Sequence, residues 1–441
     1  MIFKYLKAVL DFSSTAFNIL LLKILRECIF AKTIDFDMIK EIQIENFKSI
    51  QSLNLELGRL NVFIGANGSG KSNILEAIAF GGAATADKLD NEFLAPRGMR
   101  STRLELMLSA FKLNDTDNNI RINYKDTQND FVFLSIFNVV TWLVDWKKSS
   151  FRANFKNDFN KNIKFIKEEK PFFITLTNRM KEENQNADQL FEQELKERGI
   201  TPYWTINPMI EEQTQAFFDQ NHLKSFLIFA PENYFLRNFN EESQIIPLGV
   251  RGEGLFNHIV EIFKVNPESF KKINENLHLL DWFDGFEIPN DLMFTERRIK
   301  IKDRNLEEGL QYFDQRSANE GFLYLLFYLT LFISDETPKF FAIDNIDNAM
   351  NPKLGSELIK VLAKLSKEHG KQSILTTHNP SVLDGLDLTD DDQRLFVVSR
   401  NADGHTKVRR ILHKEVPNGV EAVRLSEAFI RGYIGGLPKN F

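Results

Sequence analysis

The stretch LNVFIGANGSGKSNILEAIAF, residues 60–80, decides the fold that this sequence predicts. Apolar residues 62–64 indicate a buried strand, and GANGSGKS, residues 65–72, matches the phosphate-binding pattern GxxxxGK[ST]. An amphipathic helix follows, so the motif has the strand, loop and helix context that it requires. The alternative is a glycine-rich turn that matches the motif by accident, and such a turn needs neither the strand before it nor the helix after it. The stretch therefore predicts a nucleotide-binding α/β domain.

Each residue type in this loop has a physical reason. Glycines allow backbone conformations that a Cβ would block, so that successive N–H groups can point at phosphate oxygens. We expect the Lys71 ammonium to reach the β- and γ-phosphates of ATP, and the Ser72 hydroxyl to bind magnesium (Mg2+). The predicted nucleotide-binding residues of the loop are Gly65, Ala66, Asn67, Gly68, Ser69, Gly70, Lys71 and Ser72.

The composition is that of an ordered globular protein. The chain has 441 residues, 43% hydrophobic and 26% charged, which is enough for two or three domains or for one large α/β core with an insertion. The 41 phenylalanines indicate large aromatic cores. A net charge of −6 gives no global argument for nucleic-acid binding, although a local basic face would still permit it.

The only cysteine, Cys28, excludes an internal disulfide and a cysteine-cluster metal site, which fits a reducing cytoplasm. The seven histidines show no ligand spacing such as HxxxH. Charged residues interrupt the apolar residues 1–37, leaving no run as long as a transmembrane helix. We expect a dispensable amphipathic extension or an upstream start codon, because Met38 opens a well-formed strand; a membrane-surface helix is the alternative.

A resemblance to a known family begins after Met38. IKEIQIENFKSIQSLNLEL alternates apolar and polar residues, which predicts two short antiparallel strands before the loop strand. The run IENFKSI followed by GANGSGKSN and LEAI resembles the N-terminal lobe of ABC-type ATPases of the RecF, OLD and SMC group. The resemblance implies an ATPase head split between residues 38–144 and 241–441, with an insertion between them.

The rest of the chain fits this division. Residues 102–135 alternate between polar turn clusters, which predicts a β-meander. Residues 145–240 include stretches dense in charge but no sustained heptads, so we expect a compact helical insertion and not a long coiled coil. Strands alternating with helices after residue 241 predict a mostly parallel core sheet, with its ligand site at the carboxyl ends of the strands. The predicted fold class is α/β.

A second motif follows the strand KFFAI. Its next residue, Asp344, matches a Walker B aspartate that binds Mg2+ through water; a plain core strand with an acidic end is the alternative. The run IDNIDNAMNP resembles the family pattern hDExExxLHP, which implies that Asn345 replaces the glutamate that polarises the attacking water. An amide cannot accept a proton as a carboxylate does, so we predict slow hydrolysis, with Asp347 as a candidate second acid.

Two further elements come from the resemblance. His378, at the end of QSILTTH, matches the switch histidine that contacts the γ-phosphate; an ordinary strand-end histidine is the alternative. The segment RSANEGF resembles the ABC signature but diverges from it. In the family, the signature offers a helix N-terminus to the ATP bound by a partner copy. The resemblance therefore predicts a head-to-tail homodimer. The predicted signature residues are Ser317, Asn319, Glu320 and Gly321.

Three functions are consistent with these motifs. About sixty residues follow His378, too few for the Toprim nuclease of OLD-type proteins, and a solvated turn explains the acidic run 390–392. The chain resembles the ATPase components of bacterial anti-phage systems such as Septu, PARIS and retron-associated modules, in which ATP-bound assemblies control a separate effector. The alternatives are a RecF-like DNA-binding repair ATPase and an ATP-gated scaffold without useful turnover.

Overall fold

The computed structural model describes residues 38–86, 88–100, 106–109, 119–127, 130–138, 146–154, 219, 222–240, 243–289, 297–307, 310, 312–413 and 423–437. All of them belong to the second of the two units into which the chain divides, Asp37–Phe441. The predicted extension, residues 1–37, lies outside the described residues. So does most of the predicted helical insertion, whose boundaries stay a prediction.

A six-stranded sheet forms the core. Its strand order is β13 (Thr406–Ile411), β12 (Gln393–Arg400), β3 (Leu60–Ile64), β11 (Gln372–Thr377), β10 (Phe340–Ile343) and β7 (Ile228–Phe229). Every neighbouring pair is parallel except β12 with β13. All residues of β3, β10 and β11 are buried, as expected for strands covered on both faces. The predicted α/β fold class with a mostly parallel sheet is confirmed.

A second sheet is wholly antiparallel, with the order β2 (Ile50–Glu56), β1 (Ile39–Phe47), β4 (Asn119–Asp126), β5 (Asp130–Asn138) and β6 (Trp146–Asn154). The predicted pair of antiparallel strands before the loop strand is therefore confirmed, with Phe47 opposite Ile50 across the turn. Strands β4 and β5 form the described part of the predicted meander. Strand β6 lies within the range for which we predicted the helical insertion.

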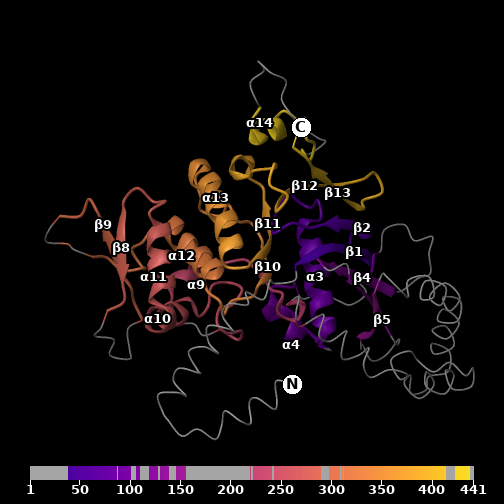
Figure 1. Cartoon of the computed structure of the whole chain (residues 1–441), viewed down its shortest axis with the longest axis horizontal. Helices are drawn as coiled ribbons and strands as arrows, with labels where there is room; N and C mark the ends of the chain where they lie inside the picture. Colours follow the sequence, from indigo (N-terminus) through magenta and orange to yellow (C-terminus); the bar gives the residue numbers. More distant parts are fainter. Residues whose placement is uncertain are drawn as a thin grey trace, which may run out of the picture. The chain divides into compact units, whose positions relative to one another are not determined.

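Helix α3 (Lys71–Thr85) lies between the two sheets (Figure 1), where it contacts β1 and β4 on one side and β7 and β11 on the other. Its GG pair allows this close packing, because a Cβ at Gly81 would lie 2.1 Å from the Tyr124 hydroxyl oxygen. The side chains of this helix are almost all buried. The loop that precedes α3 is therefore held by both sheets.

Two helices cover the other face of the core sheet. Helix α12 (Glu320–Ile333) is apolar all round and buried from Phe322 to Ile333, as its sequence predicts. The rings of Phe332 on α12 and Phe341 on β10 pack edge to face at 5.1 Å. Helix α13 (Pro352–Glu368) packs beside α12, and Gly370 just beyond it takes the left-handed conformation that is common at a helix C-terminus.

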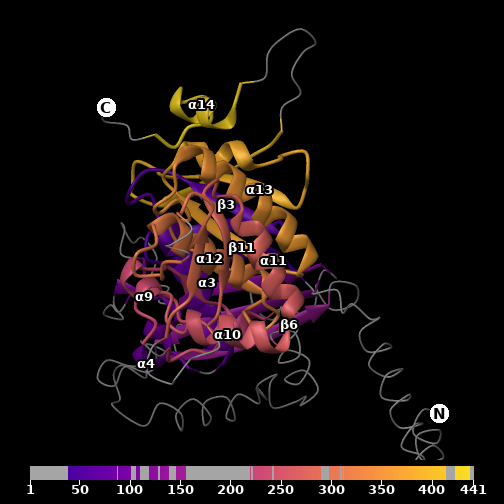
Figure 2. The same ribbon diagram turned by 90° about the vertical axis from the view of Figure 1, so that its left-hand side faces the viewer.

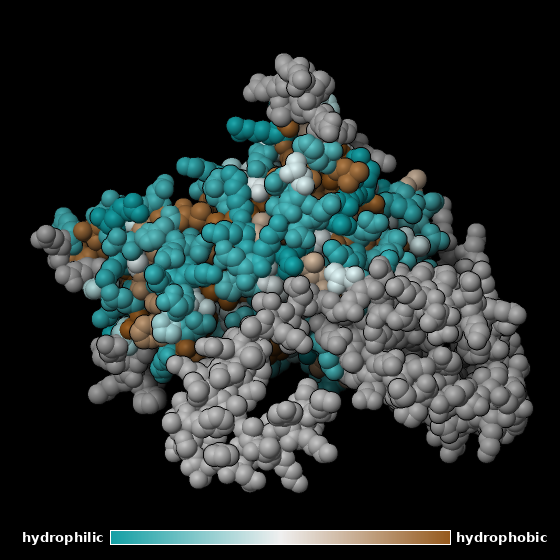
Figure 3. Space-filling view, in the orientation of Figure 1, coloured by the Kyte–Doolittle hydropathy of each residue, from teal (hydrophilic) through white to brown (hydrophobic). Residues whose placement is uncertain are grey.

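The remaining elements surround this core. They are α4 (Asn91–Leu94), η1 (Ala95–Arg97), η3 (Leu223–Ser225), α9 (Asn233–Arg237), α10 (Leu255–Val265), α11 (Pro267–Leu277), β8 (Phe283–Glu287), β9 (Lys300–Asp303), η4 (Pro380–Gly385) and α14 (Leu425–Ile430). Figure 2 shows α14 at the end of the molecule beyond α13. Helix α14 contacts η4. The described part of the surface in Figure 3 is mostly hydrophilic. Among the described residues, no helix is long and apolar enough to cross a membrane.

Candidate nucleotide-binding site

The phosphate-loop motif adopts the predicted context, because β3 ends at Ile64 and α3 begins at Lys71. Gly70 has φ 108°, a conformation that L side chains rarely adopt, and a Cβ there would lie 2.0 Å from the Thr406 Oγ1. A Cβ at Gly65 would lie 2.1 Å from the carbonyl oxygen of Val398. The backbone of the loop thus lies against β12 and β13 so closely that only glycine fits at either end.

The loop also contains a polar atom without a partner. The Ser69 hydroxyl is buried and, among the described residues, forms no hydrogen bond. The carbonyl oxygen of the same residue accepts a hydrogen bond from Thr406 Oγ1 at 3.2 Å, which fixes the backbone. Because a buried hydroxyl without a partner is costly, this arrangement fits a loop that binds a ligand with acceptor oxygens, such as a phosphate.

Lys71 points back into the loop. Its ammonium donates hydrogen bonds to the carbonyl oxygens of Gly65 at 2.8 Å and Ala66 at 3.2 Å. Burial lowers the pKa of Lys71 to about 8, although the carboxylates of Asp344 and Asp347 act in the opposite direction. An anionic ligand in the loop would favour the charged form of this lysine.

The two predicted magnesium ligands lie side by side, Ser72 at the N-terminus of α3 and Asp344 just beyond the carboxyl end of β10. Ser72 Oγ donates to Asp344 Oδ2 at 3.1 Å, and Thr376 Oγ1 donates to the other carboxylate oxygen. A hydroxyl and a carboxylate are hard oxygen ligands of the kind that Mg2+ prefers. These residues therefore fit a magnesium ion, which would neutralise phosphate charge at this place.

Asn345 follows Asp344 in the left-handed region, with φ 58°. Asparagine tolerates this conformation better than most residues, which gives a local reason for its presence. Its backbone N–H donates to Thr376 Oγ1 at 2.9 Å. Asp347, two residues on, accepts a hydrogen bond from Thr377 Oγ1 at 2.7 Å, which orients its carboxylate near the site.

His378 lies directly beyond β11, at the edge of the sheet where the loop opens. Its Nδ1 is 3.5 Å from the Lys71 ammonium nitrogen. Partial burial and the charge of Lys71 lower the pKa of His378 below its usual value. The neutral imidazole can therefore offer either a donor or an acceptor to a ligand beside Lys71.

The predicted signature residues lie elsewhere, at the N-terminus of α12. The Asn319 side chain caps this helix by accepting a hydrogen bond from the Phe322 N–H at 2.8 Å. Ser317, Asn319 and Glu320 are exposed, and Glu320 also accepts a hydrogen bond from Asn233. The structure thus brings together Lys71, Ser72, Asp344, Asp347 and His378, while the signature residues face solvent.

Sequence reasoning missed the hydroxyl groups that hold these carboxylates. Thr376 and Thr377 end β11, and the letters TT directly before His378 were a readable signal for polar groups at a strand end. Thr406 behind the loop had no such signal, because it lies 337 residues from Ser69. Glu76 was missed as well; it is buried on α3 and forms ion pairs with Lys48 and Arg100.

Comparisons with known proteins identify the family of this chain. Over residues 60–384 the chain matches the family described as "AAA domain, putative AbiEii toxin, Type IV TA system". It is 33% identical over 100 residues to a protein named DNA double-strand break repair Rad50 ATPase from Sulfolobus acidocaldarius. That match covers 22% of this chain and only 11% of the length of that protein.

A solved structure of an SMC head shares the fold. It is an SMC head bound to the C-winged helix domain of ScpA, with a TM-score of 0.50, 15% identity and coverage of 85% of this chain and 98% of that one. Another solved structure is the SMC head domain from Thermotoga maritima, with a TM-score of 0.41, 14% identity and coverage of 85% and 99%.

Proposed function

The chain belongs to this AAA-domain family, and on that premise we propose that it binds ATP with Mg2+ between two copies of itself and hydrolyses the ATP slowly. The observation that carries the proposal is the convergence of Lys71, Ser72 and Asp344 at one edge of the parallel sheet, with an amide at position 345. In this proposal Lys71 binds the β- and γ-phosphates, and Ser72 and Asp344 hold the magnesium ion.

The lowered pKa of Lys71 predicts how ATP affinity depends on pH. Above a pH of about 8, Lys71 of the free protein loses its proton, and ATP must restore the ammonium on binding. Binding then takes up one proton, so we expect the dissociation constant to rise about tenfold per pH unit above this value. Below it, Lys71 is already charged and the affinity should be flat. Titration with a fluorescent ATP analogue measures this dependence.

The control is Lys71→Arg, because a guanidinium stays protonated throughout this range. We expect the variant to bind ATP more weakly at neutral pH but to lose the steep dependence above a pH of about 8. An equally steep dependence in both proteins would assign the titration to another group and remove Lys71 from the phosphate site.

The proposed dimer is supported by the position of the signature residues, which lie at the start of α12 and apart from the phosphate loop. The first N–H groups of a helix have no partner within the helix, and at the start of α12 they lie among exposed residues. We propose that the signature residues of one copy contact the γ-phosphate bound by the loop of the other. The carboxylate of Glu320 would repel the phosphate and does not fit this contact. Its role would be to stabilise the N-terminus of α12.

We expect Gly321→Asp to prevent dimerisation with ATP and Mg2+, because its carboxylate would face the triphosphate of the partner copy. The fold tolerates the change: a Cβ at Gly321 meets nothing nearer than 3.4 Å, and an acid suits the first turn of a helix. Light scattering should give a dimer for the wild type and a monomer for the variant, which should still bind ATP.

Gly285→Asp is a matched control, since Gly285 lies in β8 and a Cβ there meets only Asn274 at 3.9 Å. This variant should dimerise as the wild type does. A wild-type protein that stays monomeric with ATP and Mg2+ would contradict the proposed dimer.

The wider role that we propose is control of a separate effector, a nuclease or toxin, in defence against phage. Two observations support it: the family is described for a toxin of a toxin–antitoxin system, and Asn345 favours a long-lived ATP state. Purification from the native host with identification of bound proteins tests it, and a stoichiometric effector is the expected result.

A DNA-repair ATPase is the second candidate, and the identity with the Rad50 ATPase favours it. That candidate predicts DNA binding by the isolated protein that ATP strengthens and salt weakens. A protein that retains intact ATP for hours would instead be a scaffold without turnover.

A further inference from the structure

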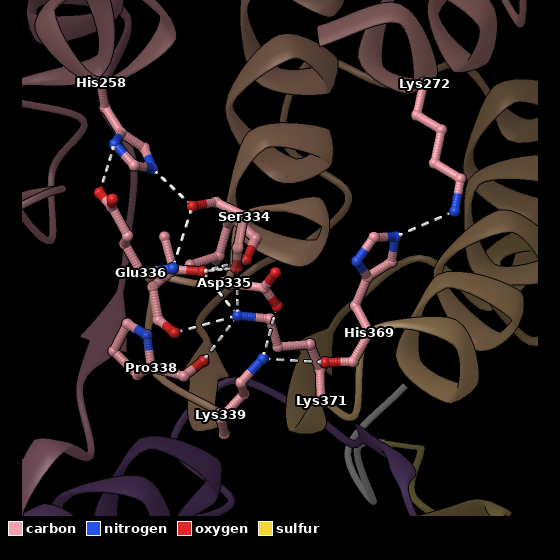
Figure 4. Close-up of polar contacts among 11 residues, drawn as sticks. His258, Lys272, Ser334, Asp335, Glu336, Pro338, Lys339, His369 and Lys371 are labelled. Carbon is pink, nitrogen blue, oxygen red and sulfur yellow. Dashed lines mark hydrogen bonds and ion pairs between the residues drawn. The ribbon is translucent and has the colours of Figure 1, made fainter. Parts of the chain in front are cut away.

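A polar cluster outside the nucleotide site surrounds the side chain of His258. This histidine lies on α10, and Glu261 lies one turn further along the same helix. Glu336 comes from residues 334–339, which we call the α12–β10 connector. Figure 4 shows His258 pointing at Glu336 and Ser334 of this connector. The cluster therefore joins two segments that are far apart in the sequence.

One ring nitrogen of His258 has no hydrogen-bond partner. The side chain is 1% exposed, and among the described residues its Nδ1 forms no hydrogen bond although it is buried. This atom faces two carboxylates, with Glu336 Oε2 at 3.6 Å and Glu261 Oε2 at 3.8 Å. Both distances are too long for hydrogen bonds. A buried nitrogen aimed at two carboxylates, without bonding to either, leaves room for a shared ligand.

The distances match those between the ligands of a tetrahedral metal ion. Zinc binds nitrogen and oxygen at about 2.0–2.1 Å, which places neighbouring ligand atoms about 3.4 Å apart. The ligand atoms of His258, Glu261 and Glu336 all lie within 4.8 Å of one another. Because both glutamates are about half exposed, their side chains can rotate to bring the ligand atoms from separations of up to 4.8 Å to this spacing. We propose that His258, Glu261 and Glu336 bind a divalent transition-metal ion, Zn2+.

The second nitrogen of the ring is held as in known metal sites. His258 Nε2 lies 2.8 Å from Ser334 Oγ, which also accepts the Glu336 N–H at 3.2 Å. A hydrogen bond at the nitrogen that does not bind metal fixes the ring orientation and the tautomer. The imidazole ligand favours Zn2+ over Mg2+ and Ca2+, which prefer sites made wholly of oxygen.

The ion would restrict the movement of two elements that carry residues of the nucleotide site. The connector joins α12, which begins among the signature residues, to β10, which ends directly before Asp344. A metal bound to α10 and to the connector would fix where both elements lie. With three protein ligands, the fourth position would be left to water. This site does not depend on the proposed ATPase function.

The test measures Zn2+ binding to the full chain without tag or nucleotide, in competition with a chromophoric chelator and with excess Mg2+ to fill oxygen sites. We expect one tight ion per chain. Because loss of a group that only supports a ligand already costs about 10- to 100-fold, Glu261→Gln and Glu336→Gln should each lower the affinity by at least this much. Both side chains are about half exposed, so both variants should fold.

Glu357→Gln is the matched control, since this half-exposed residue on α13 forms a surface ion pair with Lys360 and lies outside the cluster at His258. It should bind zinc as the wild type does. The proposal would be overturned if the wild type, Glu261→Gln and Glu336→Gln bound zinc with equal affinity, because the ion would then be adventitious and lie elsewhere. The absence of saturable zinc binding would also overturn it. Loss of the tight ion in His258→Gln, with the fold intact by circular dichroism, would identify the nitrogen ligand.

Discussion

Replacing Asn345 with glutamate should raise the single-turnover rate of ATP hydrolysis by about 10²- to 10⁴-fold. A carboxylate directly after Asp344 can accept a proton from the attacking water, and an amide cannot. The neighbouring groups are already in place, because Thr376 holds both the Asp344 side chain and the backbone of residue 345. Quenched-flow measurement with excess enzyme isolates the chemical step from nucleotide exchange.

The backbone conformation at position 345 disfavours glutamate, but its free-energy cost is smaller than the expected gain in transition-state stabilisation. Asn345 has φ 58°, and a residue other than glycine or asparagine loses about 1–2 kcal/mol in this conformation. A hundredfold rate gain corresponds to about 2.7 kcal/mol of transition-state stabilisation. Asn345→Gln separates the two effects, since it has the strain and length of glutamate but no carboxylate. We expect this control to be as slow as the wild type.

The opposite result would identify another base. If the wild type already turns over at about 1–10³ per second, the usual range for enzymes, the hypothesis of slow hydrolysis is wrong. Asp347 is then the nearest candidate, because Thr377 orients its carboxylate and its charge acts on both Lys71 and His378. In that case Asp347→Asn should abolish hydrolysis while ATP binding persists.

The sequence predicted those parts of the fold that depend on local patterns. The strand, loop and helix around Lys71 could be read because glycine spacing and an apolar run lie within one short stretch. The buried helix α12 and the strand before Asp344 could be read for the same reason. The positions of these elements are confirmed, whereas the chemical roles of their residues stay predictions.

Contacts between distant segments could not be predicted. Thr406 supports the phosphate loop from another strand, and nothing in its local sequence distinguishes it from any other strand threonine. The cluster at His258 was missed in the same way. We searched the histidines for regular ligand spacing, but Glu336 reaches His258 only through the packing of α10 against the connector. Such sites depend on tertiary structure and have no sequence motif.

Lys371→Met should lower the free energy of unfolding by about 2–4 kcal/mol. Lys371 is fully buried at the start of β11, and its ammonium lies among the oxygens of the connector (Figure 4). It donates to the carbonyl oxygens of Ser334 at 2.7 Å and Thr337 at 3.0 Å, and to Thr337 Oγ1 at 2.7 Å. Urea denaturation should show a lower midpoint with an unchanged slope.

The charge of Lys371 works against this stabilisation, because burial lowers the pKa of its ammonium well below the usual value. Methionine relieves that desolvation but removes the ammonium donor from the carbonyl oxygens of Thr337 and Pro338, whereas the Ser334 carbonyl oxygen keeps the hydrogen bond from Thr337 Oγ1 at 2.9 Å. Each such group costs about 1–3 kcal/mol, so the loss should exceed the relief. Lys364→Met is the control, since Lys364 is 75% exposed on α13 and should change stability by at most about 0.5 kcal/mol. Equal stability of the two variants would mean that water replaces the ammonium, and that the connector does not depend on Lys371 for its shape.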